Sequence, residues 1–208
     1  MLRSGARGPG EATKAMSKLH IHQFPARSDN YGVVVHDPET GATASIDAPD
    51  AEAVLAALHE KDWELTHILT THHHHDHTAG NEVLKRMTGC TIVGPAKEAR
   101  GIPGIDIKVS EGDTVEIGNV KGRVIETPGH TSGHVSYYFP DDSAVFVGDT
   151  LFAGSIGRTD LPGADHATLI HSIRQVLFAF GDEATVYPGH GPVTTVGREK
   201  RTNPFVGL

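Results

Sequence analysis

The apolar positions of this chain come in short runs separated by Gly, Pro and Asp. Such runs predict buried strands, and the clearest cover residues 31–36, 65–70, 144–148 and 184–187. Further strands are expected over residues 18–24, 42–47, 91–94 and 134–139, and a strand, a turn and a second strand over residues 112–127. Short strands with turn residues between them indicate a fold that is rich in β-structure.

Helical spacing is found in fewer places. Asp50 is suited to cap a helix that extends to about residue 60, with Val54 and Leu58 on its apolar face. Further helices are expected over residues 79–87 and 166–180, and the segment 188–208 is expected to be a loop with one helical turn. This order of elements suits an α/β fold in which two sheets pack face to face with helices outside.

Residues 1–16 contain basic residues, Gly, Pro and Ala without any periodic pattern. We therefore expect a disordered tail over residues 1–16 and a folded domain over residues 17–208. Met16 as the true start, and an organelle-targeting peptide over this segment, both stay open.

The charge, apolar runs and cysteine content of the chain indicate which partners and which compartment to expect. Lys and Arg number 18 against 26 Asp and Glu, a net charge of −8, which disfavours a nucleic acid. No apolar run approaches the roughly 18 residues of a membrane span, and no secretory signal is evident, so we expect a cytoplasmic protein without a membrane partner. A single cysteine, Cys90, fits a reducing compartment.

Histidine is the unusual residue, with 15 in the chain and five of them within residues 72–77. In an extended segment, side chains two residues apart point the same way, so His72 and His74 converge on one point. If the chain then turns into a helix, Asp76 and His77 face a second point nearby. Clustered imidazoles are costly as core packing, so this run predicts a metal site.

Three other strands end in the same way, with a Gly followed by a metal-ligand type of residue. These residues are His130, Asp149 and His190. Glycine lets the backbone turn sharply, and residues beyond the carboxyl ends of strands are well placed to form a site. We expect these side chains to join the cluster at residues 72–77.

Asp47, the run at 72–77, His130, Asp149 and His190 resemble, in order and spacing, the five motifs of the metallo-β-lactamase superfamily. The finer resemblance is to its glyoxalase II (hydroxyacylglutathione hydrolase) branch, in a short bacterial form. It rests on Asp29-Asn30-Tyr31, Thr127-Pro128-Gly129-His130-Thr131-Ser132-Gly133-His134, Gly148-Asp149-Thr150-Leu151-Phe152 and Gly157-Arg158-Thr159-Asp160. The resemblance implies an αββα sandwich with two mixed sheets.

The resemblance also implies roles. His72, His74 and His130 correspond to the ligands of a first metal, and Asp76, His77 and His190 to those of a second. Asp149 corresponds to the carboxylate that bridges both metals, and Asp47 to an acid that braces the site. Asp76 and Asp149 are the expected catalytic carboxylates. Two divalent ions are implied, with zinc as the first choice and iron or manganese as alternatives.

The implied reaction is hydrolysis of S-D-lactoylglutathione or a related acyl-thioester. Arg158 is expected to bind a glutathione carboxylate, although an ion pair with Asp160 or Asp165 explains it equally well. Other enzymes of this branch carry a C-terminal helical domain that binds glutathione, and we expect this chain to lack it. Pro192 also replaces a tyrosine that is usual in the branch.

The main competing hypothesis is a mononuclear iron persulfide dioxygenase, a related family that shares the run Gly157-Arg158-Thr159-Asp160. That family usually carries Cys at the position of His134, so His134 favours the hydrolase. A scaffold without catalysis is a further alternative. It is disfavoured because no expected ligand is missing.

Overall fold

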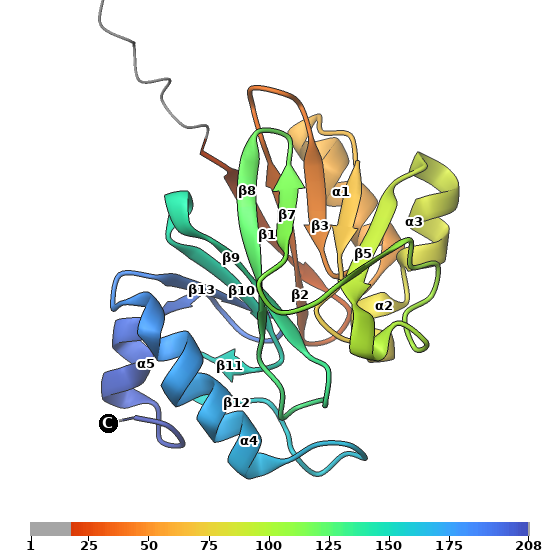
Figure 1. The fold of residues 1–208 in the computed structure, drawn as a ribbon. Coiled ribbons are helices and arrows are strands. Elements are labelled where there is room, and N and C mark those ends of the chain that lie inside the picture. The colour runs from red at the N-terminus through yellow and green to blue at the C-terminus, as the bar shows by residue number, and fades with distance from the viewer. Residues whose placement is uncertain (1–17, 208) are drawn as a thin grey trace, which may run out of the picture.

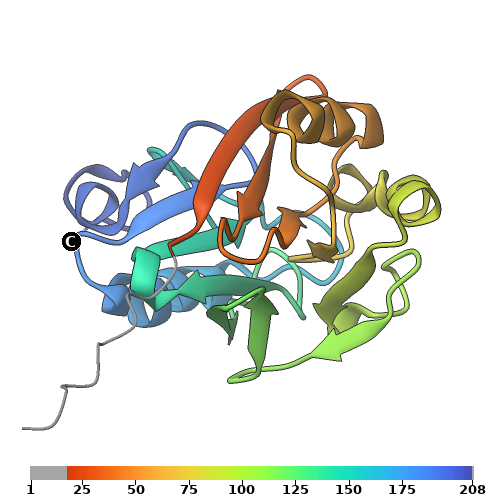
Figure 2. The same cartoon turned by 90° about the horizontal axis from the view of Figure 1, so that it is seen from above.

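The computed structural model describes residues 18–207, and the tail expected over residues 1–16 lies outside the described residues. Two mixed sheets pack face to face, and helices cover their outer faces (Figures 1 and 2). This arrangement is the αββα sandwich that the sequence predicts.

The first sheet has six strands whose spatial order follows the chain. They are β1 (His20–Ala26), β2 (Asn30–His36), β3 (Thr43–Ile46), β4 (His67–Leu69), β5 (Thr91–Pro95) and β6 (Ile107–Val109). The first three strands pair antiparallel, and β3 to β6 pair parallel.

The second sheet also has six strands, in the spatial order β14-β13-β10-β9-β8-β7. They are β7 (Thr114–Ile117), β8 (Val120–Glu126), β9 (Val135–Phe139), β10 (Ala144–Gly148), β13 (Thr185–Pro188) and β14 (Thr194–Thr195). Only β10 and β13 pair parallel within it. A separate hairpin contains β11 (Leu151–Phe152) and β12 (Ser155–Ile156).

Alternation along the strands divides the apolar residues between three clusters. Val33 and Val35 of β2 point into the core between the sheets, whereas Val34 points to the outer face. In β10, Phe146 faces the same central core and Val145 faces outward. This period of two lets each sheet bury both of its faces.

Helices complete the two outer clusters. On the first sheet lie α1 (Ala51–Lys61), the short α2 (His75–Thr78), α3 (Asn81–Thr88) and the turn η1 (Ala96–Glu98). On the second sheet lie α4 (His166–His171) and α5 (Val196–Thr202). The helix α4 is continued by η3 (Ser172–Val176) and η4 (Leu177–Phe180). The turn η2 (Pro140–Asp142) joins β9 to β10. The expectation of one helical turn after residue 188 is wrong, because α5 has seven residues.

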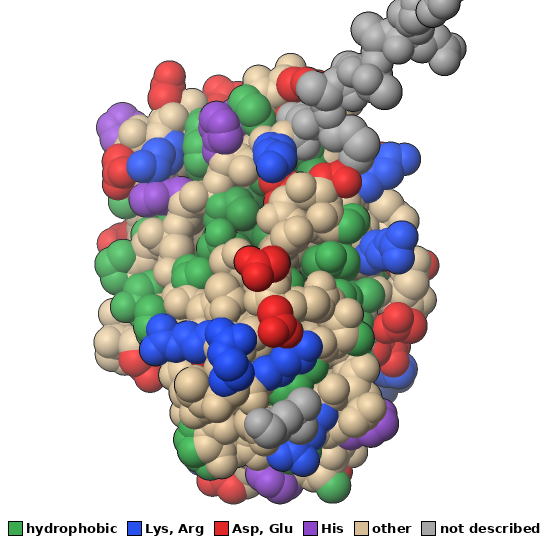
Figure 3. Space-filling view, turned by 90° about the vertical axis from the view of Figure 1, so that its left-hand side faces the viewer, with side chains coloured by type: hydrophobic (Ala, Val, Ile, Leu, Met, Phe, Trp, Pro, Cys, Tyr) green, Lys and Arg blue, Asp and Glu red, His purple; other side chains and the backbone are tan. Residues whose placement is uncertain are grey.

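Between residues 18 and 207, no helix has the length and apolar character needed to cross a bilayer. On the face shown in Figure 3, Lys and Arg side chains are spread over the upper and the lower half, and several lie close to Asp and Glu side chains. Lys200 and Arg201 of α5 both contact Asp182, at 2.9 and 3.6 Å.

Candidate metal centre

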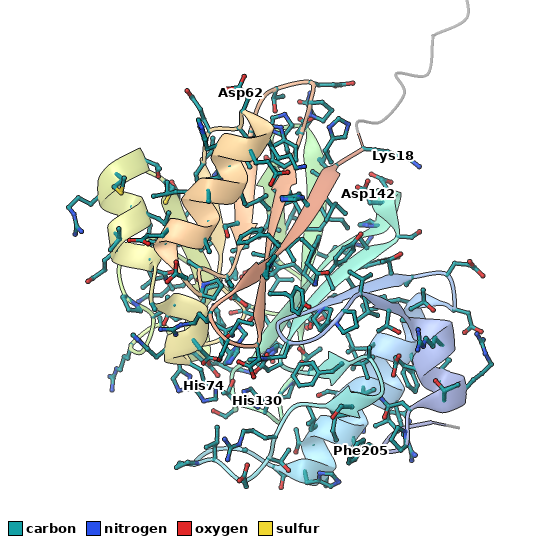
Figure 4. All side chains as sticks on the ribbon, turned by 180° about the vertical axis from the view of Figure 1, so that it is seen from behind. Lys18, Asp62, His74, His130, Asp142 and Phe205 are labelled. Carbon is teal, nitrogen blue, oxygen red and sulfur yellow. The ribbon has the colours of Figure 1, made fainter. Side chains whose placement is uncertain are left out.

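Every expected ligand lies just beyond the end of a strand, at one edge of the sandwich. The run at 72–77 follows β4 and enters α2, whereas His130 lies between β8 and β9. Asp149 follows β10, and His190 follows β13. Figure 4 shows His74 and His130 side by side at this edge, although they come from different sheets.

Three imidazoles form a first cluster. His74 Nδ1 lies 3.1 Å from His72 Nε2 and 3.0 Å from His130 Nε2. Ligand atoms that surround one zinc ion at about 2.0–2.1 Å in a tetrahedron lie about 3.4 Å from one another. The spacing of these nitrogens therefore fits three ligands of one ion.

A second cluster contains Asp76, His77 and His190. His190 Nε2 lies 3.4 Å from Asp76 Oδ2 and 3.4 Å from Asp149 Oδ2. Asp149 also faces His77 Nε2 at 3.2 Å and His130 Nε2 at 3.5 Å. Its carboxylate thus lies between the two clusters and is within reach of both.

Two buried atoms of the site lack a hydrogen-bond partner among the described residues: His77 Nε2 and Asp149 Oδ1. These atoms face each other at 3.2 Å as an ion pair but do not form a well-formed hydrogen bond, and imperfectly paired buried polar atoms are costly. A cation that both atoms can ligate removes that cost. The donors are imidazole nitrogens and carboxylate oxygens without sulfur, a set that suits zinc, iron and manganese alike.

The ring nitrogens that face away from the clusters are held by other groups. His77 Nδ1 donates to Asp47 Oδ2 at 2.8 Å, and Asp47 also accepts from the Thr71 backbone N–H at 2.7 Å. His130 Nδ1 donates to the backbone carbonyl of Arg158 at 2.8 Å. Such contacts fix the orientation of a metal-binding imidazole.

His134 is fully buried and stacks on His72, with 4.9 Å between ring centroids. Burial lowers its pKa to about 3, so the ring is neutral. Its Nε2 accepts from the Asp149 backbone N–H at 3.2 Å, which assigns the ring proton to Nδ1, near the Thr127 hydroxyl at 3.0 Å. His134 therefore helps to fix the backbone of Asp149.

In the absence of metal, burial and neighbouring carboxylates shift the pKa values of the site histidines. Burial lowers the pKa of His72 and of His74. Burial acts in the same direction on His77, but the carboxylates of Asp149 and Asp47 outweigh it and hold that pKa well above its usual value. For His190, hydrogen bonds to Asp149 and Asp76 outweigh burial and raise the pKa to about 10.

Two residues that contact this site were not singled out as site residues from the sequence. Asn30, 4% exposed, donates to Asp76 Oδ2 at 3.1 Å. Glu98 accepts from the His73 backbone N–H at 2.8 Å. Asn30 lies in a motif that carried the family resemblance, but no local pattern marks Glu98. Of the two remaining histidines of the run, His73 contacts Glu98, and His75 lines the cavity beside the clusters.

That cavity has a volume of about 450 Å³ and opens directly onto the clusters. Its lining residues are Asp29, His74, His75, Asp76, His130, Asp149, Arg158, Leu161 and His190. The Arg158 guanidinium makes a two-pronged contact with Asp160, at 2.7 and 2.8 Å, and the Arg158 side chain is 62% exposed. Asp165 instead caps α4 by accepting from the Thr168 backbone N–H.

Comparisons with known proteins agree with this geometry. Hydroxyacylglutathione hydrolases of Brucella ovis and Brucella abortus are each 53% identical to the chain over 173 residues, which is 83% of this chain and 66% of the relative. The chain thus spans slightly less than two thirds of the length of these curated relatives.

Solved structures show the same fold. ETHE1 from Myxococcus xanthus is 36% identical, with a TM-score of 0.81, and the match covers 90% of this chain and 84% of that one. The BLEG-1 B3 metallo-beta-lactamase is 30% identical, with a TM-score of 0.83 and coverage of 90% and 99%. TTHA1623, solved in a di-iron-bound form, is 34% identical, with a TM-score of 0.75 and coverage of 85% and 94%.

The model of the metallo-beta-lactamase superfamily matches residues 30–190, which run from the start of β2 to the last ligand-type histidine. Together with the ligand-type clusters at the strand ends, this match indicates a site for divalent metal. The chain belongs to the metallo-beta-lactamase superfamily.

Proposed function

We propose that this chain is a metal-dependent thioester hydrolase of glyoxalase II type, which cleaves S-D-lactoylglutathione or a related acyl-thioester. The observation that carries the proposal is the position of Asp149 between two complete ligand clusters at the floor of an open cavity. The similarity to hydroxyacylglutathione hydrolases over 83% of the chain supports this choice of substrate class.

His72, His74 and His130 would hold one divalent ion, and Asp76, His77 and His190 would hold a second, with Asp149 shared between them. Zinc is the first choice, with iron and manganese as alternatives. Bound divalent ions of this kind supply activated water at neutral pH and polarise an acyl carbonyl.

The chain's own residues prepare the site for this chemistry. Burial keeps His72 neutral, which leaves its Nε2 lone pair available as a ligand. Burial acts to raise the pKa of Asp149, but the neighbouring His77 and His190 outweigh burial and keep Asp149 an anion. No cysteine or serine is among the residues that line the cavity, so the nucleophile would be water activated by bound metal. A strong proton donor is not required either, because a thiolate leaves readily.

Arg158 is the cation placed to bind the substrate. It lines the cavity, and its guanidinium presents the two-pronged geometry that suits a carboxylate. Asp160 holds that position in the free protein, so a glutathione carboxylate would take the place of Asp160. We therefore propose a small glutathione-derived thioester as the substrate, without a nucleic acid or membrane partner.

Because the one cysteine, Cys90, is a buried free thiol, we propose the cytoplasm as the location.

A metal count on purified protein, run together with a panel of thioesters, tests the proposal. We expect about two divalent ions per chain and hydrolysis of S-D-lactoylglutathione that a chelator abolishes. Protein that holds metal but hydrolyses no thioester would contradict the proposed activity, and protein without metal would contradict the proposed site.

A mononuclear iron persulfide dioxygenase is the second candidate. The observation that favours it is the run at residues 157–160, which brings Arg158 to the cavity. Against it stands His134, whose imidazole contacts the Asp149 backbone. Oxygen uptake with a persulfide, together with one iron per chain, would identify the dioxygenase.

A further inference from the structure

Glu98 is a buried acid that contacts two separate loops of the metal centre. It ends the turn η1 after β5, and the residue is 6% exposed. Its Oε2 accepts from the backbone N–H of His73 at 2.8 Å and from the ring Nδ1 of His73 at 2.7 Å. Its Oε1 accepts from the backbone N–H of Gly133 at 2.9 Å.

The two backbone groups belong to loops that carry ligands. His73 lies between His72 and His74 in the loop after β4 of the first sheet. Gly133 lies in the connection from β8 to β9 of the second sheet, three residues after His130. One carboxylate therefore joins the two halves of the sandwich at the point where they assemble the first cluster.

Close packing leaves little freedom in this contact. A Cβ placed on Gly133 would lie 2.6 Å from Glu98 Cγ and 2.7 Å from Lys97 Cβ. Real side chains do not approach so closely, so the connection can reach Glu98 only with glycine at position 133.

Glu98 forms no ion pair with a Lys or Arg of the described residues, and its one charged partner is His73, through Nδ1 at 2.7 Å. The adjacent Lys97 pairs with Glu126 at 2.6 Å instead. Burial acts to raise the pKa of Glu98, but the hydrogen-bond donors around its carboxylate outweigh burial and hold the pKa below its usual value. A buried anion among backbone N–H groups costs desolvation energy, and only well-formed hydrogen bonds offset that cost.

We propose that Glu98 is a positioning residue for the first metal cluster: it holds the 72–74 loop and the 130–134 loop at the separation that brings three imidazole nitrogens to one point. The inference rests on the metal-dependent function proposed above. Groups that orient ligands without touching the metal typically change metal affinity by about 10–100-fold when mutated.

Glu98→Gln tests this directly. Whichever way the new amide turns, its NH₂ group faces a backbone N–H, so one of the two loops loses its acceptor. We expect zinc affinity, measured by competition with a chelator, to fall by at least about tenfold. The rise in Tm on adding zinc should shrink as well, because that rise reports binding to the folded state. For the thioester, kcat should fall because less metal is bound. KM should stay nearly unchanged, because Arg158, the residue proposed to bind the substrate, lies on another loop.

Two variants serve as controls. Glu126→Gln makes the same chemical change in the exposed pair with Lys97 and should leave zinc affinity and the zinc-induced Tm rise as in the wild type. His73→Ala removes only the ring contact and keeps the backbone acceptor, so its zinc affinity should fall less than that of Glu98→Gln.

A lower Tm of the metal-free Glu98→Gln protein with unchanged zinc affinity would show that Glu98 is only structural and would overturn the inference. If Glu98→Gln cannot be obtained folded, Glu98→Asp applies the same test, because its shorter side chain cannot reach both loops. A wild-type protein that binds no divalent ion would instead overturn the proposed function, so the two failures are distinct.

Discussion

Asp149 is the residue on which the two clusters depend most directly. Its two oxygens face different histidines, Oδ1 toward His77 and Oδ2 toward His130 and His190. We expect Asp149→Asn to lose nearly all hydrolysis and most of the second metal, because a neutral amide neither bridges two cations nor balances their charge. Metal analysis and kcat measured on the same preparation check this.

The fold of that variant should persist, because the backbone N–H of Asp149 still donates to His134. Far-ultraviolet circular dichroism provides the control. A folded Asp149→Asn protein with two metals and full turnover would show that Asp149 does not bridge the clusters.

Arg158 contributes to the site through two different groups. Its guanidinium pairs with Asp160 beside the cavity that Arg158 lines, whereas its backbone carbonyl accepts from His130 Nδ1 at 2.8 Å. Arg158→Ala removes only the first, so we expect KM for a glutathione thioester to rise with kcat nearly unchanged. The contact to a carboxylate is charge-assisted, so its loss should raise KM roughly tenfold.

Two measurements distinguish substrate binding from a structural ion pair. A small thioester without glutathione carboxylates should be hydrolysed equally by both forms. Asp160→Ala frees the guanidinium and should not raise KM for the glutathione thioester. If Asp160→Ala raises KM as much as Arg158→Ala, the ion pair shapes the loop, and Arg158 does not bind substrate directly.

The candidate ligands can be proposed from the sequence because they are histidines and aspartates that follow apolar strands, and the structure brings these side chains together. Residues that hold those ligands are much harder to predict. Glu98 is separated by 35 residues from Gly133, the group that it contacts, and its own surroundings have no distinctive pattern. Its importance depends on how the two sheets pack, which no local pattern encodes.

At the scale of elements, the start of α1 offers a direct test of local stability. Asp50 caps this helix by accepting from the Ala53 backbone N–H at 2.9 Å, as its position before the apolar pattern predicts. We expect Asp50→Ala to lower the free energy of unfolding by about 0.5–2 kcal/mol, measured by urea titration.

Glu52→Ala is the matched control, since it removes an exposed acid from the same first turn without removing a cap. The control should cost less, about 0.3–1 kcal/mol, because only the interaction with the helix dipole is lost. Equal losses for the two variants would mean that charge, and not capping, explains the effect of Asp50.

Elements with a clear period were predicted within a few residues of their bounds; α3, for example, ends at Thr88, where the sequence predicts an end at about residue 87. Shorter elements were missed for physical reasons. The strands β11 and β12 have two residues each, which is too few for alternation to be visible. The strand β6 has three residues and lies at a sheet edge, where Ile107 is exposed. The helix expected over 166–180 is instead three successive helical segments with different hydrogen-bond spacing.

On the scale of the whole molecule, both clusters draw ligands from both sheets. His72 and His74 meet His130 across the sandwich, and Asp76 and His77 meet His190 in the same way. Metal bound at these clusters would therefore link the two halves, and it should raise the stability of the entire fold.

This coupling makes the stabilisation by metal depend on pH. In the metal-free protein the pKa of His190 is raised to about 10, and that of His77 is also raised. Both rings are therefore protonated on both nitrogens, and positively charged, at pH 7. Protonated His190 stabilises the metal-free fold fully below the unfolded pKa of about 6.5, and that stabilisation is lost as the pH rises through about 10. A metal ion must displace these protons, so metal binding strengthens as the pH rises.

We therefore expect the difference in Tm between zinc-loaded and metal-free protein to widen from pH 6 to pH 8 at a fixed concentration of free zinc. Release of two protons corresponds to a metal affinity that rises up to about a hundredfold per pH unit. Calorimetry in buffers with different ionisation enthalpies counts the released protons independently. In Asp149→Asn, which removes a carboxylate that holds both protons, fewer protons should be released and the widening should be smaller. A Tm difference that stays constant between pH 6 and pH 8 would show that the ring protons are not displaced, and that metal binds away from His77 and His190.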